Sequence, residues 1–454
     1  MSTTTLPESP ATPGLAASSM GGFEVLAQSV AGIAPSAVMA TGPALVAIGA
    51  GGAIMYSYAA STVILIMVGW CITQFARREG EGGTLLSYIA KAFGPGAGFV
   101  GAVGLAFGYA LIAVASLAGV ALYVEPLIGL SGTATTLVIE VIVAALAALA
   151  MVRGVQLSTR VGVVLEAVSI CAILVVIATV LATKGLSTAP LHPKGLSTTG
   201  VTGGMVLAIL GYVGFESAAC MGTEAKSPTR TIPRAVLGSV AIVTVLYLLS
   251  SYAQLIGFTD PAKITASAAP LNQLADAAGV HLFGYLIDIG ATASFFACVT
   301  GSLNAAGRLA FSMGQDGLLH RAVGIAHPTR RTPHLALIGL SAACALIAVV
   351  MTAAGVSTLN VFAYTGTIGT FGYMIAYILI AVGAPVYLRK IGARIASTAV
   401  VGGLAAAGMC YVLYKNVWPV PASPYNLLPW IFLGVLLLAG GWYAIVKVRP
   451  VPAT

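Results

Sequence analysis

Long apolar runs alternate with short polar breaks along nearly the whole chain. A helix needs about 20 apolar residues to cross the hydrocarbon part of a bilayer. Twelve runs come close to this length or exceed it, so the pattern predicts an all-α membrane protein with 12 transmembrane helices. The predicted spans are 27–48, 52–76, 96–127, 132–152, 159–183, 201–222, 234–258, 281–311, 334–353, 358–387, 395–415 and 427–447.

The basic residues are distributed unevenly between alternate loops. Short cytoplasmic loops accumulate Lys and Arg, and with a cytoplasmic N-terminus all but four of the 21 basic residues fall on the cytoplasmic side. A miscount by one span would reverse the assignment from that point onward, so the asymmetry supports the number and orientation of the spans. The sequence predicts a multi-pass protein of the cell (inner) membrane with cytoplasmic N- and C-termini. The four outer residues are Lys184, Lys194, Lys263 and Lys415.

The composition agrees with a chain surrounded by a lipid bilayer. Hydrophobic residues make up 58% of the chain and charged residues 7%, which is too apolar for an ordinary soluble protein. The formal net charge of +8 follows from the orientation of the spans, so no nucleic-acid partner is expected. The six cysteines lie in apolar runs without CxxC spacing or a nearby pair of histidines. We interpret them as packing residues and expect neither a metal nor a cofactor.

The N-terminal segment differs from the rest of the chain. Its first 20 residues are rich in Ser, Thr, Pro and Ala and contain no Lys or Arg, so the basic start of a secretory signal peptide is missing. Such a composition favours disorder. Residues 1–26 are predicted to form a disordered cytoplasmic tail.

Two predicted spans are interrupted at matching places. The first contains Gly and Pro within 32–36, and the sixth contains two glycines followed by an acid within 211–217. Proline removes a backbone donor and clashes with the preceding turn, so the helix should unwind there. Breaks in the first helix of each of two five-helix halves indicate an inverted-repeat transporter with substrate near the middle of the membrane. The alternative is that both helices are kinked for packing, since Gly and Pro are common in membrane helices.

The loops near these breaks carry a specific pattern. The sixth span has Gly-Phe-Glu-Ser-Ala-Ala at 214–219, followed by Glu-Ala-Lys-Ser-Pro-Thr-Arg-Thr-Ile-Pro-Arg-Ala at 224–235. These stretches resemble the amino acid/polyamine/organocation (APC) superfamily of permeases, as do parts of 81–95 and 308–333. The resemblance implies 5+5 inverted repeats with broken helices 1 and 6. The implied units are 27–183 for the first five-helix repeat, 201–387 for the second, and 395–447 for two additional transmembrane helices.

The two breaks supply the predicted substrate-binding residues. Pro35-Ser36-Ala37 stands where many relatives have Gly-Ser-Gly, and Tyr212 aligns with an aromatic gate position. At the position of Leu210, a related arginine exchanger has a large aromatic residue. A bulky guanidinium substrate is therefore disfavoured, and a neutral amino acid is favoured. Tyr109 could line the cavity or pack within the membrane. The predicted set is Ala34, Pro35, Ser36, Ala37, Tyr109, Tyr212, Val213 and Phe215.

Ionisable groups at bilayer depth are costly and suggest function. Glu216 follows the second break, where burial disfavours its charged form and favours binding of a proton. Glu166 lies one turn before Ser169, the position where many relatives have a lysine, and could replace that lysine as a proton site. Ser169 and Thr300 could instead hold sodium. For each of these the alternative is a structural hydrogen bond, for the hydroxyls to a carbonyl one turn back. Glu140 and Asp288 have no motif support and are expected to be structural.

Together these features predict a secondary active transporter of an amino acid or related small amine, with alternating access and H+ as the favoured coupling ion. The alternatives are a sodium-coupled symporter with Na+ as coupling ion, an amino acid exchanger, or a substrate-sensing receptor of the same fold. An intramembrane enzyme is not expected, because the chain has no HExxH motif or paired aspartates in facing helices. Nothing resembles the filter loop or carboxylate ring of a channel.

Overall fold

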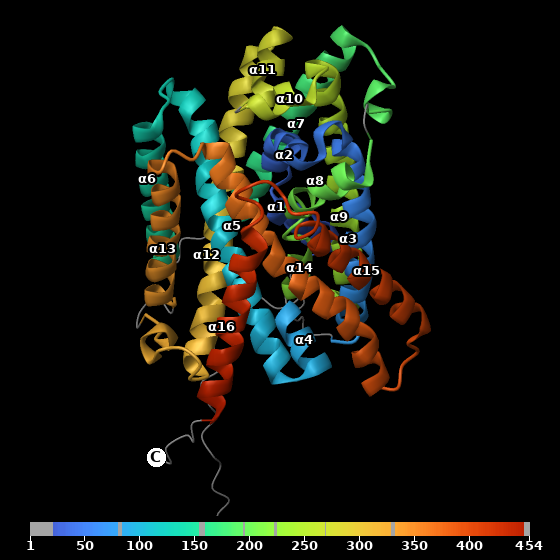
Figure 1. Ribbon diagram of the computed structural model, residues 1–454, viewed down its shortest axis with the longest axis vertical. Helices are drawn as coiled ribbons and strands as arrows, with labels where there is room; N and C mark the ends of the chain where they lie inside the picture. Colours follow the sequence, from blue (N-terminus) through green and yellow to red (C-terminus); the bar gives the residue numbers. More distant parts are fainter. Residues whose placement is uncertain are drawn as a thin grey trace, which may run out of the picture.

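The protein is described by a computed structural model. It covers residues 21–79, 84–153, 159–193, 196–221, 225–267, 269–327 and 332–448. Residues 1–20, most of the predicted N-terminal tail, lie outside the described residues. Within the described part the chain folds into helices joined by short loops (Figure 1). The helices are α1 (Gly22–Ile33), α2 (Pro35–Ala50), η1 (Gly51–Ala53), α3 (Ile54–Ala76), α4 (Leu85–Phe93), α5 (Pro95–Ile128), α6 (Thr133–Val152), α7 (Thr159–Lys184), η2 (Ala189–Leu191), α8 (Thr198–Leu210), η3 (Phe215–Met221), α9 (Pro228–Phe258), α10 (Pro261–Ala266), α11 (Pro270–Ala277), α12 (His281–Gln315), η4 (Arg321–Gly324), α13 (His334–Ala353), α14 (Thr358–Lys390), α15 (Ala396–Lys415) and α16 (Leu428–Val448).

Ten helical stretches of the described chain are long and apolar enough to cross a membrane. One of them, Gly22–Ala76, contains α1, α2 and α3 and so covers the first two predicted spans. The sixth predicted span corresponds to the shorter apolar helix Thr198–Leu210 and the turn and η3 that follow it. The short helices α4, α10 and α11 lie in segments that the hydropathy pattern left as loops. The protein is therefore an all-helical, multi-pass membrane protein.

Both predicted breaks are present. α1 ends at Ile33, Ala34 adopts a left-handed conformation with φ 57°, and α2 starts at Pro35. Proline suits the first position of a helix, where its missing N–H costs nothing, but it cannot continue α1. After α8, the chain turns at 211–214 and continues as η3.

The two breaks lie against each other. Gly214 has φ +110°, and a Cβ added there would lie 2.6 Å from the carbonyl oxygen of Gly32. Glycine is therefore needed at position 214 for both its backbone conformation and the close contact. The unwound segments of two helices about 180 residues apart in sequence meet in one place.

A second proline in α2 is compensated by a neighbouring helix. Pro43 has no N–H to donate to the carbonyl of Met39 one turn earlier. The Ser250 hydroxyl (2.6 Å) and the Gln254 side-chain amide (3.0 Å), both on α9, donate to this Met39 carbonyl instead. α2 can therefore contain an internal proline without leaving a buried carbonyl unpaired.

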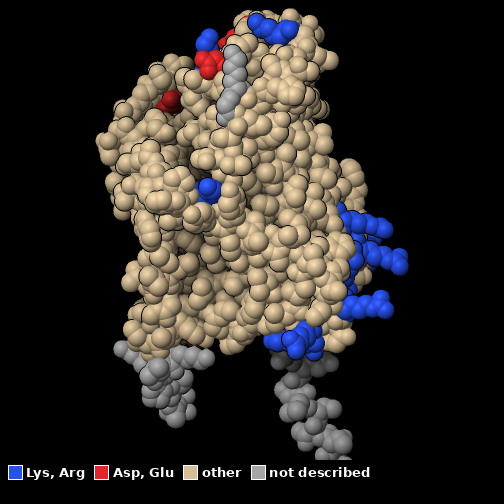
Figure 2. Space-filling view, turned by 45° about the vertical axis from the view of Figure 1, so that its right-hand side comes forward, with Lys and Arg blue, Asp and Glu red and all other residues tan. Residues whose placement is uncertain are grey.

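The interior is organised around the long helix α5, which packs along α12 and α14. α5 and α14 approach closely where glycines face each other: a Cβ on Gly372 would lie 2.3 Å from the Gly104 carbonyl oxygen. Small residues at such crossings allow close backbone contact between membrane helices. Figure 2 shows a broad surface with very few charged side chains, with a group of Lys and Arg side chains at the lower right and mixed charges at the top.

Candidate functional site

A cavity of about 690 Å³ lies beside the two breaks. This volume is within the range of small-molecule sites, roughly 300–1,000 Å³. Its wall is mainly apolar and comes from the two breaks and from α2, α5, α8, α12 and α14, with part of α4 at one end. Polar wall residues away from the breaks include Ser294, Asn304 and Arg308 of α12.

The cavity brings together half of the predicted substrate-binding residues. Ala34 and Ala37 from the first break, Tyr109 from α5 and Val213 from the second break line it. Tyr109 stacks edge-on against Tyr373 of α14, with ring centroids 5.2 Å apart, and both rings contribute to the wall. Pro35 and Ser36 are buried and lie outside the wall itself.

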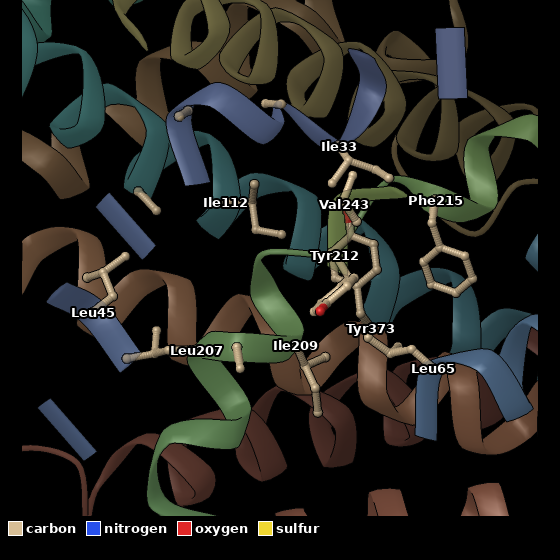
Figure 3. Packing of buried hydrophobic residues seen from close by; sticks show 14 of the residues in the cluster. Ile33, Leu45, Leu65, Ile112, Leu207, Ile209, Tyr212, Phe215, Val243 and Tyr373 are labelled. Carbon is tan, nitrogen blue, oxygen red and sulfur yellow. The ribbon is translucent and has the colours of Figure 1, made fainter. Parts of the chain in front are cut away.

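The structure places Tyr212 and Phe215 in the protein interior, away from the cavity wall. The Tyr212 hydroxyl is 2.8 Å from Thr62 Oγ1 on α3, and the ring packs edge-on against Tyr247 of α9. Phe215 packs against Tyr377 of α14. Figure 3 shows both rings within the cluster of buried apolar side chains. Both side chains pack in the apolar interior next to the second break and do not face the cavity.

Of the four predicted coupling residues, Glu216 is the one that lines the cavity. It lies in η3, is 5% exposed and forms part of the cavity wall. One of its carboxyl oxygens accepts hydrogen bonds from the Gly214 N–H (3.1 Å) and the Tyr377 hydroxyl (3.0 Å). The turn at Gly214 and helix α14 therefore fix this carboxyl group at the break.

Glu166 lies behind the first break. Its Oε1 accepts a hydrogen bond of 2.6 Å from the backbone N–H of Ser36, the second residue of α2. The side chain comes from α7 and is 7% exposed. The two buried acids thus each bind one of the breaks, Glu166 the first and Glu216 the second.

The structure does not bring Ser169 and Thr300 together. Ser169 packs against Gly290 of α12, where an added Cβ would lie 2.3 Å from the Ser169 hydroxyl. Gly290 and Thr300 are ten residues apart on the same helix, which corresponds to about 15 Å along its axis. The Thr300 hydroxyl donates to the carbonyls of Phe296 and Ala297 one turn back. Two groups so far apart cannot bind one ion together.

The two acids without motif support lie away from the cavity wall. Glu140 on α6 accepts a hydrogen bond from Thr352 on α13 (3.0 Å). Asp288 on α12 accepts from the side-chain amide of Asn272 on α11 (2.6 Å). Each acid joins two neighbouring helices.

Some residues of the cavity wall, and Tyr377 behind it, carried no signal in the sequence. Tyr373 and Tyr377 are two of many membrane aromatics and have no motif around them. Arg308 enters the sequence analysis only as a basic residue of the cytoplasmic side, near the end of the span predicted over 281–311, and the structure shows that it lines one end of the cavity.

Comparison with known proteins matches nearly the whole chain to one protein family. The profile described as "Amino acid permease" matches residues 15–438. A branched-chain amino acid permease of Lactococcus lactis is 27% identical over 61% of this chain and 63% of its own. The cationic amino acid transporter 7 of Arabidopsis thaliana is 25% identical over 78% and 63%, and a methylthioribose transporter of Bacillus subtilis is 27% identical over 63% and 65%. The chain thus spans less than two thirds of the length of these relatives.

Proposed function

Because the chain belongs to the amino acid permease family, we propose that it is a secondary active transporter of an amino acid or related small amine. The cavity beside the two helix breaks is the observation that carries this proposal. Unwound helices offer backbone N–H and C=O groups to a substrate at membrane depth, and a mainly apolar wall gives it shape. Transport then occurs by alternating access to this cavity from the two sides of the cell membrane.

The proposed architecture is the 12-span arrangement with two five-helix repeats. The first repeat is 27–183, the second is 201–387, and 395–447 adds two helices. The paired breaks after Ile33 and Leu210 support it, since each lies in the first helix of its repeat. Both termini are proposed to be cytoplasmic, on the basis of the distribution of basic residues.

The cavity wall supports a neutral amino acid as the favoured substrate. Leu45, Leu207, Leu210 and Phe295 are among its apolar side chains. The C-terminal ends of α1 and α8 direct carbonyl groups toward the breaks, where an ammonium group is favoured. The relative named as a branched-chain amino acid permease agrees with this size and chemistry.

Proton coupling through Glu216 is the favoured energy source. Glu216 is the one carboxyl side chain in the cavity wall formed by the described residues. A buried acid in contact with the substrate path can bind and release a proton as the cavity opens to either side. A sodium-coupled symporter is the alternative, although Ser169 and Thr300 do not form a joint site for it.

Counterflow in proteoliposomes tests this function. The purified full chain is reconstituted, loaded with unlabelled compound and offered the labelled form, using the twenty amino acids and common amines. Accumulation of at least one compound is expected. No accumulation with any of them would contradict transport and favour the substrate-sensing receptor. Uptake at two pH values, with sodium or with choline in its place, separates proton from sodium coupling.

A further inference from the structure

The N-terminal end of α2 offers few backbone donors to a ligand. Helix N-termini attract anions because their first N–H groups have no partner within the helix. In α2 the first residue is Pro35, which has no N–H, so the N–H of Ser36 is the first donor that this end presents. A carboxylate bound at this end of α2 would use this group together with the N–H of Ala37, the third residue of the helix.

The Ser36 N–H already binds a carboxyl group of the protein itself. Glu166 Oε1 lies 2.6 Å from the Ser36 nitrogen. Glu166 is on α7, which packs against both α1 and α2, and this contact joins residues 130 positions apart. The side chain therefore occupies the anion-binding end of the broken helix.

The other groups near Glu166 do not neutralise it. The hydroxyls of Ser36, Ser294 and Tyr247 lie close to it, from α2, α12 and α9. In the part of the chain that the structure describes, the ion pairs are Glu79 with Lys91 and Asp276 with His281, and neither involves Glu166. A charged Glu166 is balanced mainly by the N-terminal end of α2.

The cavity borders this end of α2, with Ser36 and Glu166 directly behind its wall. Ala34 and Ala37, on either side of Pro35 and Ser36, line the cavity wall. A substrate carboxylate that approached this end of α2 would meet the Glu166 carboxylate there. Two like charges that share one site cannot both remain ionised without a large loss of binding.

We infer that Glu166 and a substrate carboxylate compete for the N-terminal end of α2. This inference rests on the proposed function and concerns the same cavity. An amino acid then binds together with a proton from solution, which converts the Glu166 carboxylate to a carboxylic acid. An amine without a carboxylate binds while Glu166 remains charged, because its ammonium group uses the carbonyl ends of α1 and α8.

Two probes that differ only in the carboxylate test the competition. L-Leucine and 3-methylbutylamine share the same branched side chain and amine. Calorimetry of the purified full chain, in buffers of different ionisation enthalpy, counts the protons taken up on binding. For leucine we expect uptake of about one proton and a binding constant that falls about tenfold per pH unit where Glu166 is charged. For 3-methylbutylamine we expect neither effect.

The Glu166→Gln variant keeps an oxygen that can accept from the Ser36 N–H but cannot carry charge. Its leucine binding should lose the proton uptake, and above neutral pH should be at least about tenfold tighter than that of the unaltered protein, as expected when a coupled proton is no longer required. Binding of 3-methylbutylamine should not tighten. Glu140→Gln is the matched control, because it also neutralises a buried acid but lies away from the cavity, and it should leave both probes unchanged.

Two results would overturn the inference. One is leucine binding without proton uptake by the unaltered protein, a measurement that needs no variant. The other is an equal change for both probes in Glu166→Gln. Either can occur while leucine is still transported, which leaves the proposed function intact. If the unaltered protein transports and binds no amino acid or amine, the proposed function fails and this inference fails with it.

Discussion

Glu216 combines three properties in one side chain. It lines the cavity, it is almost completely buried, and its carboxyl group accepts two hydrogen bonds that hold it at the second break. A glutamine at this position keeps an oxygen for the Gly214 N–H and the Tyr377 hydroxyl but cannot exchange a proton. The substitution therefore separates the structural role of this residue from its proposed role in coupling.

For Glu216→Gln we expect that uptake driven by an imposed proton gradient loses most of its rate and keeps at most the part that the proton on Glu166 supports, whereas counterflow without net proton movement continues. Both are measured with labelled substrate in proteoliposomes that contain equal amounts of folded protein. Glu140→Gln serves again as the control for neutralising a buried acid. Uptake with unchanged rate and pH profile in Glu216→Gln would remove this residue from the coupling mechanism.

The residue scale also shows what sequence patterns can and cannot predict. Pro35 and Gly214 determine their own backbone conformations, so the positions of both breaks were evident without a structure. The direction of Tyr212 depends on how the second break is rotated against α3 and α9, and no local pattern encodes that rotation. The contact between Glu166 and Ser36 joins two helices far apart in sequence, so the acid was recognised as a candidate but its partner was not.

At the scale of single helices, prolines and glycines determine which neighbours each helix requires. α2 contains Pro43, and its unpaired Met39 carbonyl requires donors from α9. α5 and α14 cross at glycines, which requires that neither helix carries a side chain at the contact. The periodic apolar pattern predicted that these helices exist, but the pairing of helices became visible only in the structure.

Removing the Gln254 amide should destabilise the protein more when Pro43 is present than when it is replaced. For Gln254→Leu we expect a loss of about 1 kcal/mol, the usual value of a side-chain hydrogen bond within a membrane protein. In the Pro43→Ala background the restored N–H can bond to the Met39 carbonyl, so the same substitution should cost less. A double-mutant cycle of unfolding free energies in mild detergent measures the difference. Equal costs in both backgrounds would show that the Met39 carbonyl does not depend on Gln254.

The crossing of α5 and α14 should tolerate no methyl group at Gly372. An added Cβ would lie 2.3 Å from the Gly104 carbonyl oxygen, so the helices must separate. We expect Gly372→Ala to lower stability by about 1–3 kcal/mol, as for overpacked cores, and to weaken substrate binding because the neighbouring Tyr373 lines the cavity. Gly403→Ala on α15 is the control, since nothing lies within 4 Å of its added Cβ. Thermal unfolding and binding of the two variants compare these effects, and similar behaviour of both would contradict the close crossing.

At the scale of the whole molecule, a polar network joins three elements at one end of the bundle. Glu79 follows α3 and pairs with Lys91 of α4, and its other carboxyl oxygen accepts a 2.8 Å hydrogen bond from the Tyr387 hydroxyl of α14. Lys390, near the end of α14, donates to the Ala92 carbonyl of α4 (2.8 Å). The cavity extends to Leu85 of the same α4, so the network fixes the helix that borders one end of the cavity.

The Glu79 contacts should make stability depend on pH. The Lys91 hydrogen bond, with a smaller contribution from Tyr387, holds the pKa of Glu79 below its usual value of 4.5. A carboxyl group whose pKa is lower in the folded than in the unfolded state stabilises the protein above the unfolded pKa, and this contribution is lost as the pH falls through the folded pKa. Because the Lys91 side chain is 46% exposed, solvent screening limits the contribution to less than about 1 kcal/mol.

Glu79→Gln should therefore lower the melting temperature slightly at pH 7 and not at pH 3, and high salt should reduce the difference. Melting curves of both proteins across this pH range test it, and a difference that grows on acidification would mean that the ionised carboxylate does not stabilise this end of the bundle.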